Sequence, residues 1–297
     1  MAISDELTRI QTAKADIKAS IEAKGVTVPS DALIDEYADY VDEISGGGQA
    51  EQELKDLIEG DIVTLNIPNG TTKIKEYFQY KNLSLTTLTI PNSVTLIDDY
   101  TFMNCSSLTN VTIGNGVNEV KMNAFWACSS LPKEDNISYA GDCAVIVNGN
   151  QTSYAIKDGT RLLKDGLFYY NSTITSITLP NSLIIIPLNA FGGCSSLTSI
   201  NIPNSVTTIG QSAFLKCSIT SVTIPNTVTT IGQSAFQNCS SLTSITILAT
   251  TPPTLGLNVF NNTNDCPIYV PAESVEAYKA ATNWVTYASR IQAIPSE

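Results

Sequence analysis

The side chains that could catalyse acid–base or metal chemistry are few in this sequence. It contains no histidine, which excludes a histidine general base, a Ser-His-Asp triad and histidine metal ligands. Adjacent carboxylates occur at Asp98 and Asp99 and at Glu134 and Asp135, but neighbouring residues on a strand or turn point apart, unlike a glycosidase pair. The sequence also lacks phosphate-binding glycine loops and calcium loops. We therefore expect no enzyme activity, no metal and no cofactor.

Seven cysteines are the other reactive side chains, and most of them share one place in a repeating pattern. The cysteines that share it are Cys105, Cys128, Cys194, Cys217 and Cys239. Asn82 and Asn171 occupy the same place in sister segments. An odd number of cysteines argues against a fold in which all of them are paired in disulfides. The cysteines also lack the CxxC spacing of a metal site. We interpret these residues as structural thiols that satisfy backbone groups in a turn, in a protein that folds in a reducing compartment.

The elements that position these cysteines are eight copies of one segment, 23 residues apart except for one 22-residue step and one 43-residue gap. The copies start at Leu65, Leu88, Val111, Tyr154, Ile177, Ile200, Val222 and Ile245. Each copy begins with apolar residues at alternate positions, which predicts a short strand, and a following Pro-Asn pair predicts a turn. A phenylalanine recurs at one offset, in Phe102, Phe125, Phe168, Phe191, Phe214 and Phe236. This period predicts a solenoid of about eight coils with a stacked aromatic column in a continuous core.

The repeating pattern CSSLTSITIPNSVTTIGQSAF resembles the BspA-like, or Treponema-type, leucine-rich repeat. The resemblance covers residues 62–297, and the end of the chain is similar to the closing segment of many such proteins. It implies an α+β repeat fold, a right-handed leucine-rich-repeat solenoid. It also implies a role in binding and adhesion, often at a bacterial surface, with no catalytic activity in the repeat.

Residues 1–45 carry two helical patterns, the second opened by Ser30. A heptad seam that Lys14 interrupts is formed by Ile3, Leu7, Ile10, Ile17 and Ile21. The pair is either a hairpin that packs on itself or a docking module that forms a homodimer or homotrimer. We favour the second interpretation because so small a pair has little core, and because the glycines of residues 46–49 separate it like a hinge. This segment also resembles the start of phage tail or fibre proteins that carry the same repeat.

The remaining segments complete the expected domain organisation. We expect residues 50–64 to cap the first coil, residues 65–248 to form the solenoid and residues 249–297 to form a C-terminal cap. The repeat breaks within residues 134–153, where an alternating run ends at Asn148 and Gly149 and predicts a projecting β-hairpin. That insert is either a tolerated surface insertion or a ligand contact.

Two surfaces are candidates for binding. The outward strand positions are Thr89, Thr112, Thr178, Asn201, Thr223 and Thr246, flanked by Ser176, Ser199, Ser221 and Ser244. One interpretation of these residues is structural, because threonine and serine suit any exposed strand of a duplicated repeat. The functional alternative is weak multivalent contact with a glycan or a flat protein partner. Trp126 follows a column phenylalanine and is expected to be half-exposed, so we predict a recognition patch around Trp126, Asn148 and Gly149.

Charge and targeting patterns narrow the function classes. The formal net charge of −12 argues against nucleic acid and acidic membranes as partners. The chain starts without the basic and apolar regions of a signal peptide and has no apolar run of about 18 residues, so ordinary export and membrane insertion are not expected.

The leading hypothesis is a fibre or structural protein of a bacterial virus, assembled in the host cytoplasm. Residues 1–45 would attach it to capsid or tail proteins of the virion, and the solenoid would face host-surface glycans or proteins. The alternatives are a bacterial surface adhesin and an intracellular protein-binding scaffold.

Overall fold

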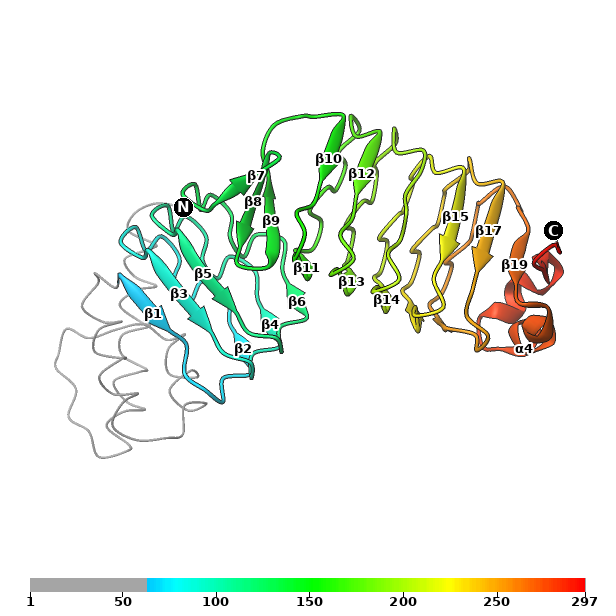
Figure 1. Cartoon of the computed structure of the whole chain (residues 1–297), viewed down its shortest axis with the longest axis horizontal. Helices are drawn as coiled ribbons and strands as arrows, with labels where there is room; N and C mark the ends of the chain where they lie inside the picture. Colours follow the sequence, from blue (N-terminus) through cyan, green and yellow to red (C-terminus); the bar gives the residue numbers. More distant parts are fainter. Residues whose placement is uncertain (1–62, 297) are drawn as a thin grey trace, which may run out of the picture. The chain divides into compact units, whose positions relative to one another are not determined.

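A computed structural model describes residues 63–296, which divide into two compact units of stacked coils (Figure 1). The described residues of the first unit are 63–117 and Asn123–Leu131, and those of the second unit are Asn118–Met122 and 132–296. The predicted N-terminal helices, with Ile3, Leu7, Ile10, Ile17 and Ile21, lie outside the described residues. So do the glycine linker and most of the predicted N-terminal cap.

The first unit contains two parallel sheets. One sheet consists of β1 (Thr64–Asn66), β3 (Thr87–Ile90) and β5 (Asn110–Ile113). On the other side of each coil, β2 (Lys73–Ile74) pairs with β4 (Leu96–Ile97). The strands pair in register, so that Leu65 lies beside Leu88 and Leu88 beside Val111. Like residues therefore stack on like residues, as the repeat predicts.

Proline sets the length of the first strand in most coils. The carbonyl of Pro91 accepts a hydrogen bond from the amide of Val94 at 3.2 Å, and Pro225 accepts one from Val228 at 3.1 Å. Proline has no N–H to continue a ladder, so the strand stops and a four-residue turn follows. This turn redirects the chain toward the second short strand of the same coil.

The second unit has the same arrangement in a larger number of coils. Two of its sheets lie on the side of the coils that carries the first strand. One consists of β10 (Ser153–Ala155) and β12 (Ser176–Thr178). The other consists of β15 (Ser221–Ile224), β17 (Ser244–Ile247), β19 (Ile268–Val270) and β20 (Ile291–Ala293). The opposite sheet consists of β13 (Ile185–Ile186), β14 (Thr208–Ile209), β16 (Thr230–Ile231) and β18 (Thr254–Leu255). β6 (Glu119–Val120) also belongs to this unit.

The insert contains antiparallel strands, but the predicted turn is wrong. Its sheet consists of β7 (Lys133–Glu134), β8 (Ile137–Ala140), β9 (Cys143–Val147) and β11 (Leu162–Leu163). The two-residue turns lie at Asp135–Asn136, where both residues have positive φ, and at Gly141–Asp142. Asn148 and Gly149 instead lead from β9 to β10, because β9 already pairs with β8 and, in parallel, with β11.

The predicted number of coils is also too small, since the described chain forms about ten turns. One additional turn is the insert, which breaks the repeat in the sequence. The other begins at β19, which pairs with β17 in parallel as the preceding strands do. Beyond it lie two 3₁₀-helices, η1 (Ala272–Ser274) and η2 (Trp284–Arg290), on either side of α4 (Val275–Ala280).

The expected α+β class does not describe the coils, which form a β-solenoid. Among residues 63–296, α4 is the only α-helix. In the coils, tight turns with residues at positive φ, such as Asn104, Asn189 and Asn238, stand where other repeat proteins place helices. Asparagine tolerates this left-handed conformation better than most residues.

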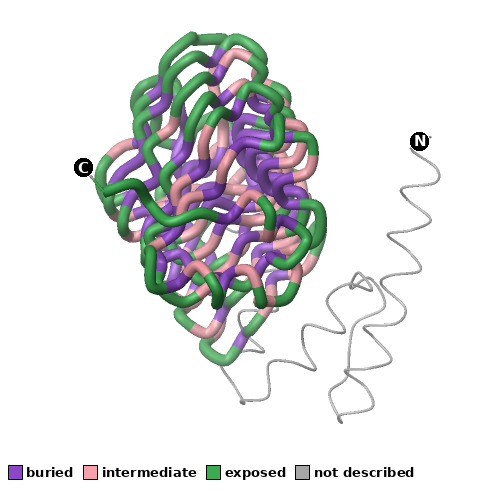
Figure 2. The backbone as a smooth tube through the Cα atoms, turned by 90° about the vertical axis from the view of Figure 1, so that its right-hand side faces the viewer, coloured by how far each residue is buried: buried purple, intermediate pink, exposed green. Residues whose placement is uncertain are grey.

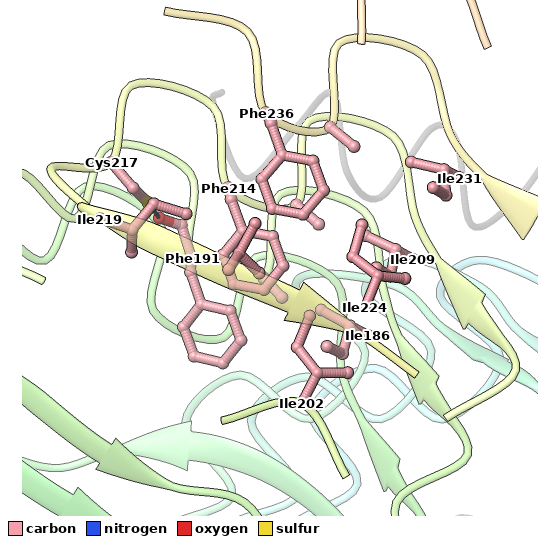
Figure 3. Packing of buried hydrophobic residues seen from close by; sticks show 14 of the residues in the cluster. Ile186, Phe191, Ile202, Ile209, Phe214, Cys217, Ile219, Ile224, Ile231 and Phe236 are labelled. Carbon is pink, nitrogen blue, oxygen red and sulfur yellow. Dashed lines mark hydrogen bonds between the residues drawn. The ribbon is translucent and has the colours of Figure 1, made fainter. Parts of the chain in front are cut away.

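The predicted aromatic column is confirmed. In the second unit Phe168, Phe191, Phe214, Phe236 and Phe260 stack in sequence, with ring centroids 5.1 to 5.7 Å apart. In the first unit Phe102 stacks on Phe125 at 5.3 Å. Figure 3 shows the column beside a parallel row of isoleucines, and Figure 2 shows that buried stretches alternate with exposed turns along each coil.

A thiol ladder runs beside the aromatic column. The Sγ of Cys217 donates to the carbonyl of Phe191 in the preceding coil at 3.1 Å, and Cys239 donates to Phe214 at 3.0 Å. Asn171, in the same place, instead accepts hydrogen bonds from the amides of Thr173 and Ile174 within its own turn. Cysteine therefore joins neighbouring coils, whereas asparagine closes one turn. Both are structural roles, as predicted.

We expect all seven cysteines to resist alkylation in the native protein, because all are free and buried. Burial raises the pKa of the Cys194 and Cys239 thiols to about 12, so the reactive thiolate is scarce at pH 8. Treatment with iodoacetamide followed by intact-mass spectrometry should show no added groups on native protein and seven on protein unfolded in guanidinium. Rapid labelling of native protein would contradict this arrangement.

Candidate functional site

The outward strand residues form regular rows within each unit. Thr89 lies beside Thr112 in the first unit, and Thr223 lies beside Thr246 in the second. Thr178 on β12 pairs with Ala155 on β10. We call the predicted set the hydroxyl face: Thr89, Thr112, Thr178, Asn201, Thr223 and Thr246. Alternation along each strand sends the flanking apolar residues into the core and the five threonines outward. Asn201, predicted at the matching strand position, lies in no strand of the structure. All six residues are exposed or half-buried.

Most other serine and threonine columns are used by the fold. The hydroxyl of Thr243 donates to the carbonyl of Thr220 at 2.9 Å, and Ser218 donates to Ser195 at 2.7 Å. Similar bonds link neighbouring coils elsewhere, through Thr109, Thr175, Thr207, Ser196 and Thr227. These hydroxyls satisfy carbonyl groups in the turns and hold adjacent coils together.

The hydroxyl face differs from these columns because its polar groups are free. Within residues 63–296, no hydroxyl of its five threonines forms a hydrogen bond to another protein group. The strand backbone beneath them is already satisfied by the parallel ladders. The free hydroxyls recur at the spacing of neighbouring strands, about 4.8 Å. An external ligand can therefore use them without breaking any bond of the fold.

The row in the second unit continues beyond the residues that the sequence pattern singled out. Thr246 pairs with Tyr269 on β19, and Tyr269 pairs with Gln292 on β20. Tyr269 falls within the predicted C-terminal cap of residues 249–297, so the prediction did not extend the outward row to it. Alternation between Ile268 and Val270, which are buried, was sufficient to place Tyr269 on the outside.

The predicted recognition patch is only partly a free surface. Trp126, in the first unit, has 57% of its surface exposed. In the second unit, the Asn148 amide donates to the Ser138 hydroxyl at 3.0 Å, and the Gly149 carbonyl accepts from the Tyr154 hydroxyl at 2.9 Å. Asn148 and Gly149 thus hold the segment between β9 and β10. Their joint role with Trp126 in recognition stays a prediction.

The charge of the chain is unevenly distributed. Residues 63–296 contain 11 lysines and arginines and 12 aspartates and glutamates. Residues 1–62 contain only 5 lysines and arginines but 15 aspartates and glutamates. The acidic excess therefore belongs to the N-terminal residues and not to the coils. Because the hydroxyl face carries no charged side chain and the coils are nearly neutral, long-range attraction of a charged partner is weak there.

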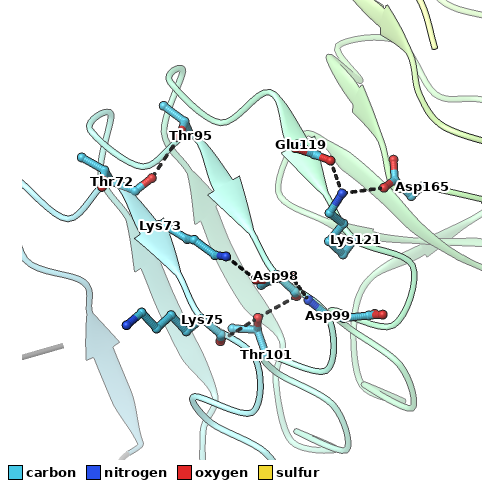
Figure 4. A network of polar contacts seen from close by, with 10 residues as sticks. All are labelled: Thr72, Lys73, Lys75, Thr95, Asp98, Asp99, Thr101, Glu119, Lys121 and Asp165. Atoms are coloured by element: carbon cyan, nitrogen blue, oxygen red, sulfur yellow. Dashed lines mark hydrogen bonds and ion pairs between the residues drawn. The ribbon is translucent and has the colours of Figure 1, made fainter. Parts of the chain in front are cut away.

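The adjacent carboxylates are either held by other groups of the fold or exposed to solvent. Asp98 is paired with Lys73 at 2.6 Å (Figure 4), and Asp99 accepts a hydrogen bond from the Asn123 amide at 2.7 Å. Glu134 and Asp135 are exposed at the turn between β7 and β8. In the described part of the chain, no cluster of three or more Cys, Asp or Glu could hold a metal ion.

One carboxylate is buried away from the hydroxyl face. Asp165 is 3.5 Å from the ammonium of Lys121, which also contacts Glu119 (Figure 4). Asp165 Oδ2 has no hydrogen-bond partner in the described protein. Burial raises the pKa of this carboxyl to about 6, and the Lys121 charge opposes that rise only in part. A buried carboxyl whose pKa is raised makes stability depend on pH.

Comparison with known proteins identifies the repeat. A family profile described as BspA type leucine rich repeat region matches in six copies, over residues 59–144 and 162–281. The comparisons indicate no enzyme family. No curated protein matches the chain. None of the described residues forms a helix long and apolar enough to cross a membrane.

Several solved structures are similar to the chain. A leucine-rich repeat protein from Bacteroides ovatus ATCC 8483 is 22% identical, with a TM-score of 0.37 over 70% of this chain and 63% of that one. A leucine rich cell surface protein from Faecalibacterium prausnitzii A2-165 is 25% identical, with a TM-score of 0.37 over 65% and 62%. The leucine rich repeat protein of T. pallidum is 22% identical, with a TM-score of 0.31 over 71% and 80%. The chain spans less than two thirds of the first two proteins.

Proposed function

Because the chain belongs to the family of BspA-type leucine-rich repeat proteins, we propose that it is a non-enzymatic adhesion module of a bacterial cell surface. The hydroxyl face is the surface through which it binds. The observation that carries this proposal is the row of outward threonine hydroxyls with no partner in the fold, whereas most other serine and threonine columns bridge neighbouring coils.

The physical basis of binding is multivalency. A single hydrogen bond exchanged with water contributes only about 0.5–1.5 kcal/mol, so one hydroxyl holds a ligand weakly. Coils repeated in register let a repetitive glycan or a flat protein surface form many such contacts at once, and linked contacts multiply into useful avidity. An uncharged face also keeps this attachment insensitive to salt.

Family membership favours the bacterial-surface alternative over the virion hypothesis. The features that suggested a virion protein are the heptad seam and the phage-like start, and both lie in residues 1–45, outside the described residues. The comparisons do not extend to that resemblance, so attachment to a capsid or tail and formation of a homo-oligomer stay predictions. Adhesion through the coils does not depend on them.

Beads coated with the intact protein are expected to attach to plates coated with mucin, fibronectin or collagen. The double variant Thr223→Arg/Thr246→Arg should reduce attachment on the order of tenfold, because two bulky charges block neighbouring coils of the hydroxyl face. The matched control Gln211→Arg/Gln233→Arg adds the same charges to neighbouring coils at exposed turns and should attach normally. Equal loss in both variants, or wild-type attachment no greater than that of albumin-coated beads, would overturn the proposal.

A further inference from the structure

A pair of tyrosines on the second unit is exposed without an evident role in the fold. Tyr169 and Tyr170 follow Phe168, the buried member of the aromatic column. Tyr169 keeps 38% of its surface exposed and Tyr170 keeps 61%. Their ring centroids are 4.4 Å apart and the planes are tilted by 56°. The two rings form an aromatic corner at the turn, away from the strands of the hydroxyl face.

Two glycines in the next coil make room for this pair. A Cβ at Gly193 would lie 2.6 Å from Cδ1 and 3.0 Å from Cε1 of Tyr170, and a Cβ at Gly192 would lie 3.2 Å from Cδ2 of Tyr169. The Tyr170 amide donates to the Gly192 carbonyl at 2.7 Å, which fixes the tyrosines directly over the glycine pair. Each phenol ring therefore rests against bare backbone.

Backbone conformation does not explain why glycine is used at the second position. Gly193 has a φ of 79°, but the matching residues of the next two coils, Lys216 and Asn238, adopt φ values of 58° and 61° with full side chains. Those coils continue the same hydrogen-bond ladder, from the Gly193 amide to Leu215 and from the Lys216 amide to Gln237. The absence of a side chain at Gly193 is therefore explained by the tyrosine ring above it.

Two serines stand close in sequence, one two residues after Tyr170 and the other two residues after Gly193. Ser172 and Ser195 are exposed, and the Ser195 amide donates to the Gly193 carbonyl at 2.8 Å. Within residues 63–296 neither serine hydroxyl forms a hydrogen bond. The nearest charged residue along this column is Lys216, one coil beyond Gly193. An exposed aromatic pair, with free hydroxyls on the same turns, offers apolar contact and hydrogen bonding together.

From this arrangement we propose that Tyr169 and Tyr170, supported on Gly192 and Gly193, bind a pyranose ring of a neutral glycan. The C–H-rich face of a pyranose packs on the negative face of an aromatic ring, while its hydroxyls need polar partners such as the two serines. One side of the Tyr170 ring is closed by Gly193, yet most of the side chain stays exposed, so a sugar has a firm surface to stack on. The site is separate from the hydroxyl face.

The test is binding of the intact, fluorescently labelled protein to a printed array of neutral and sialylated glycans. Wild type should bind a subset of neutral glycans, Tyr170→Ala should lose about tenfold in signal, and Tyr170→Trp should keep it. Gly193→Ala should also lose binding, because the added Cβ displaces the ring while every aromatic residue remains. Tyr77→Ala, at another exposed tyrosine, and Lys216→Ala are the matched controls and should bind normally.

Two outcomes would overturn the proposal. One is array binding that Tyr170→Ala and Gly193→Ala leave unchanged, and the other is the absence of binding to any glycan, whether or not a proline-rich peptide probe binds instead. The Thr223→Arg/Thr246→Arg variant should keep its array signal, which separates this site from adhesion through the hydroxyl face. Circular dichroism of each variant establishes that a lost signal is not lost folding.

Discussion

Replacing Phe214 by alanine is expected to lower the free energy of unfolding by about 3–5 kcal/mol. Phe214 is fully buried and lies in the middle of the column, 5.4 Å from Phe191 and 5.1 Å from Phe236 between ring centroids. Alanine would remove the buried apolar surface and the contacts on both ring faces, and the surrounding strands are fixed by their ladders, so the cavity cannot close.

Urea unfolding followed by far-UV circular dichroism measures this loss as a shift of the midpoint. Repeat arrays can unfold in parts, so fluorescence of the buried Trp284 near the end of the chain should be followed as a second probe. Phe214→Leu should cost clearly less, and Thr223→Ala on the exposed side of the following coil should stay within about 0.5 kcal/mol of wild type. A loss below about 1 kcal/mol for Phe214→Ala would mean that the column does not support the core.

The aromatic column and the thiol ladder could be predicted because the same residue type returns at the same offset in successive copies of the repeat. A residue type that returns at one offset must meet itself across adjacent strands, which is why Phe191 stacks on Phe214 and on no other ring type. The number of coils could not be obtained in this way. The insert and the coil that begins at β19 keep the stacking but lose the sequence pattern, since pairing in a ladder requires only backbone and an apolar inward side chain.

The insert shows how a local pattern is overridden by its neighbours. Asn148 and Gly149 are typical of a two-residue hairpin turn, yet β9 has no free edge for the strand that follows. It pairs with β8 on one side and with β11 on the other. The turns that do form, at Asp135–Asn136 and Gly141–Asp142, have equally good turn residues. Nothing local in the sequence separates the used turn from the unused one.

The candidate surfaces were predictable in position but not in function. Alternation placed Thr246 on the outside, but the sequence does not distinguish it from Thr243, whose hydroxyl bridges to the preceding coil at 2.9 Å. Whether a threonine hydroxyl is free or bonded depends on whether the turn of the preceding coil brings a carbonyl within its reach, as it does for Thr243. The tyrosine pair was missed for the same reason. Gly192 and Gly193 look like ordinary turn glycines until the rings of the preceding coil are placed above them.

Asp165→Asn is expected to stabilise the protein at neutral pH and to have little effect near pH 4. The Asp165 side chain is 3% exposed, and burial raises its pKa from 3.8 to about 6. Between these values the folded state binds more protons than the unfolded state, so the free energy of unfolding falls as pH rises through this window. The full shift corresponds to a penalty of about 3 kcal/mol above pH 6, which asparagine, always neutral, does not incur.

Thermal or urea unfolding of both proteins at pH 4.5 and pH 7.5 measures this difference directly. Effects of other carboxylates on pH dependence cancel, because they are common to both proteins. Lys121→Met is the informative control: it removes the ammonium 3.5 Å from Asp165, so the pKa of Asp165 should rise further and the loss of stability at neutral pH should grow. An equal effect of Asp165→Asn on stability at both pH values would contradict this prediction. It would mean that the Asp165 carboxylate is ionised in the folded protein at pH 4.5 as well as at pH 7.5, because Lys121 fully compensates the cost of burying its charge.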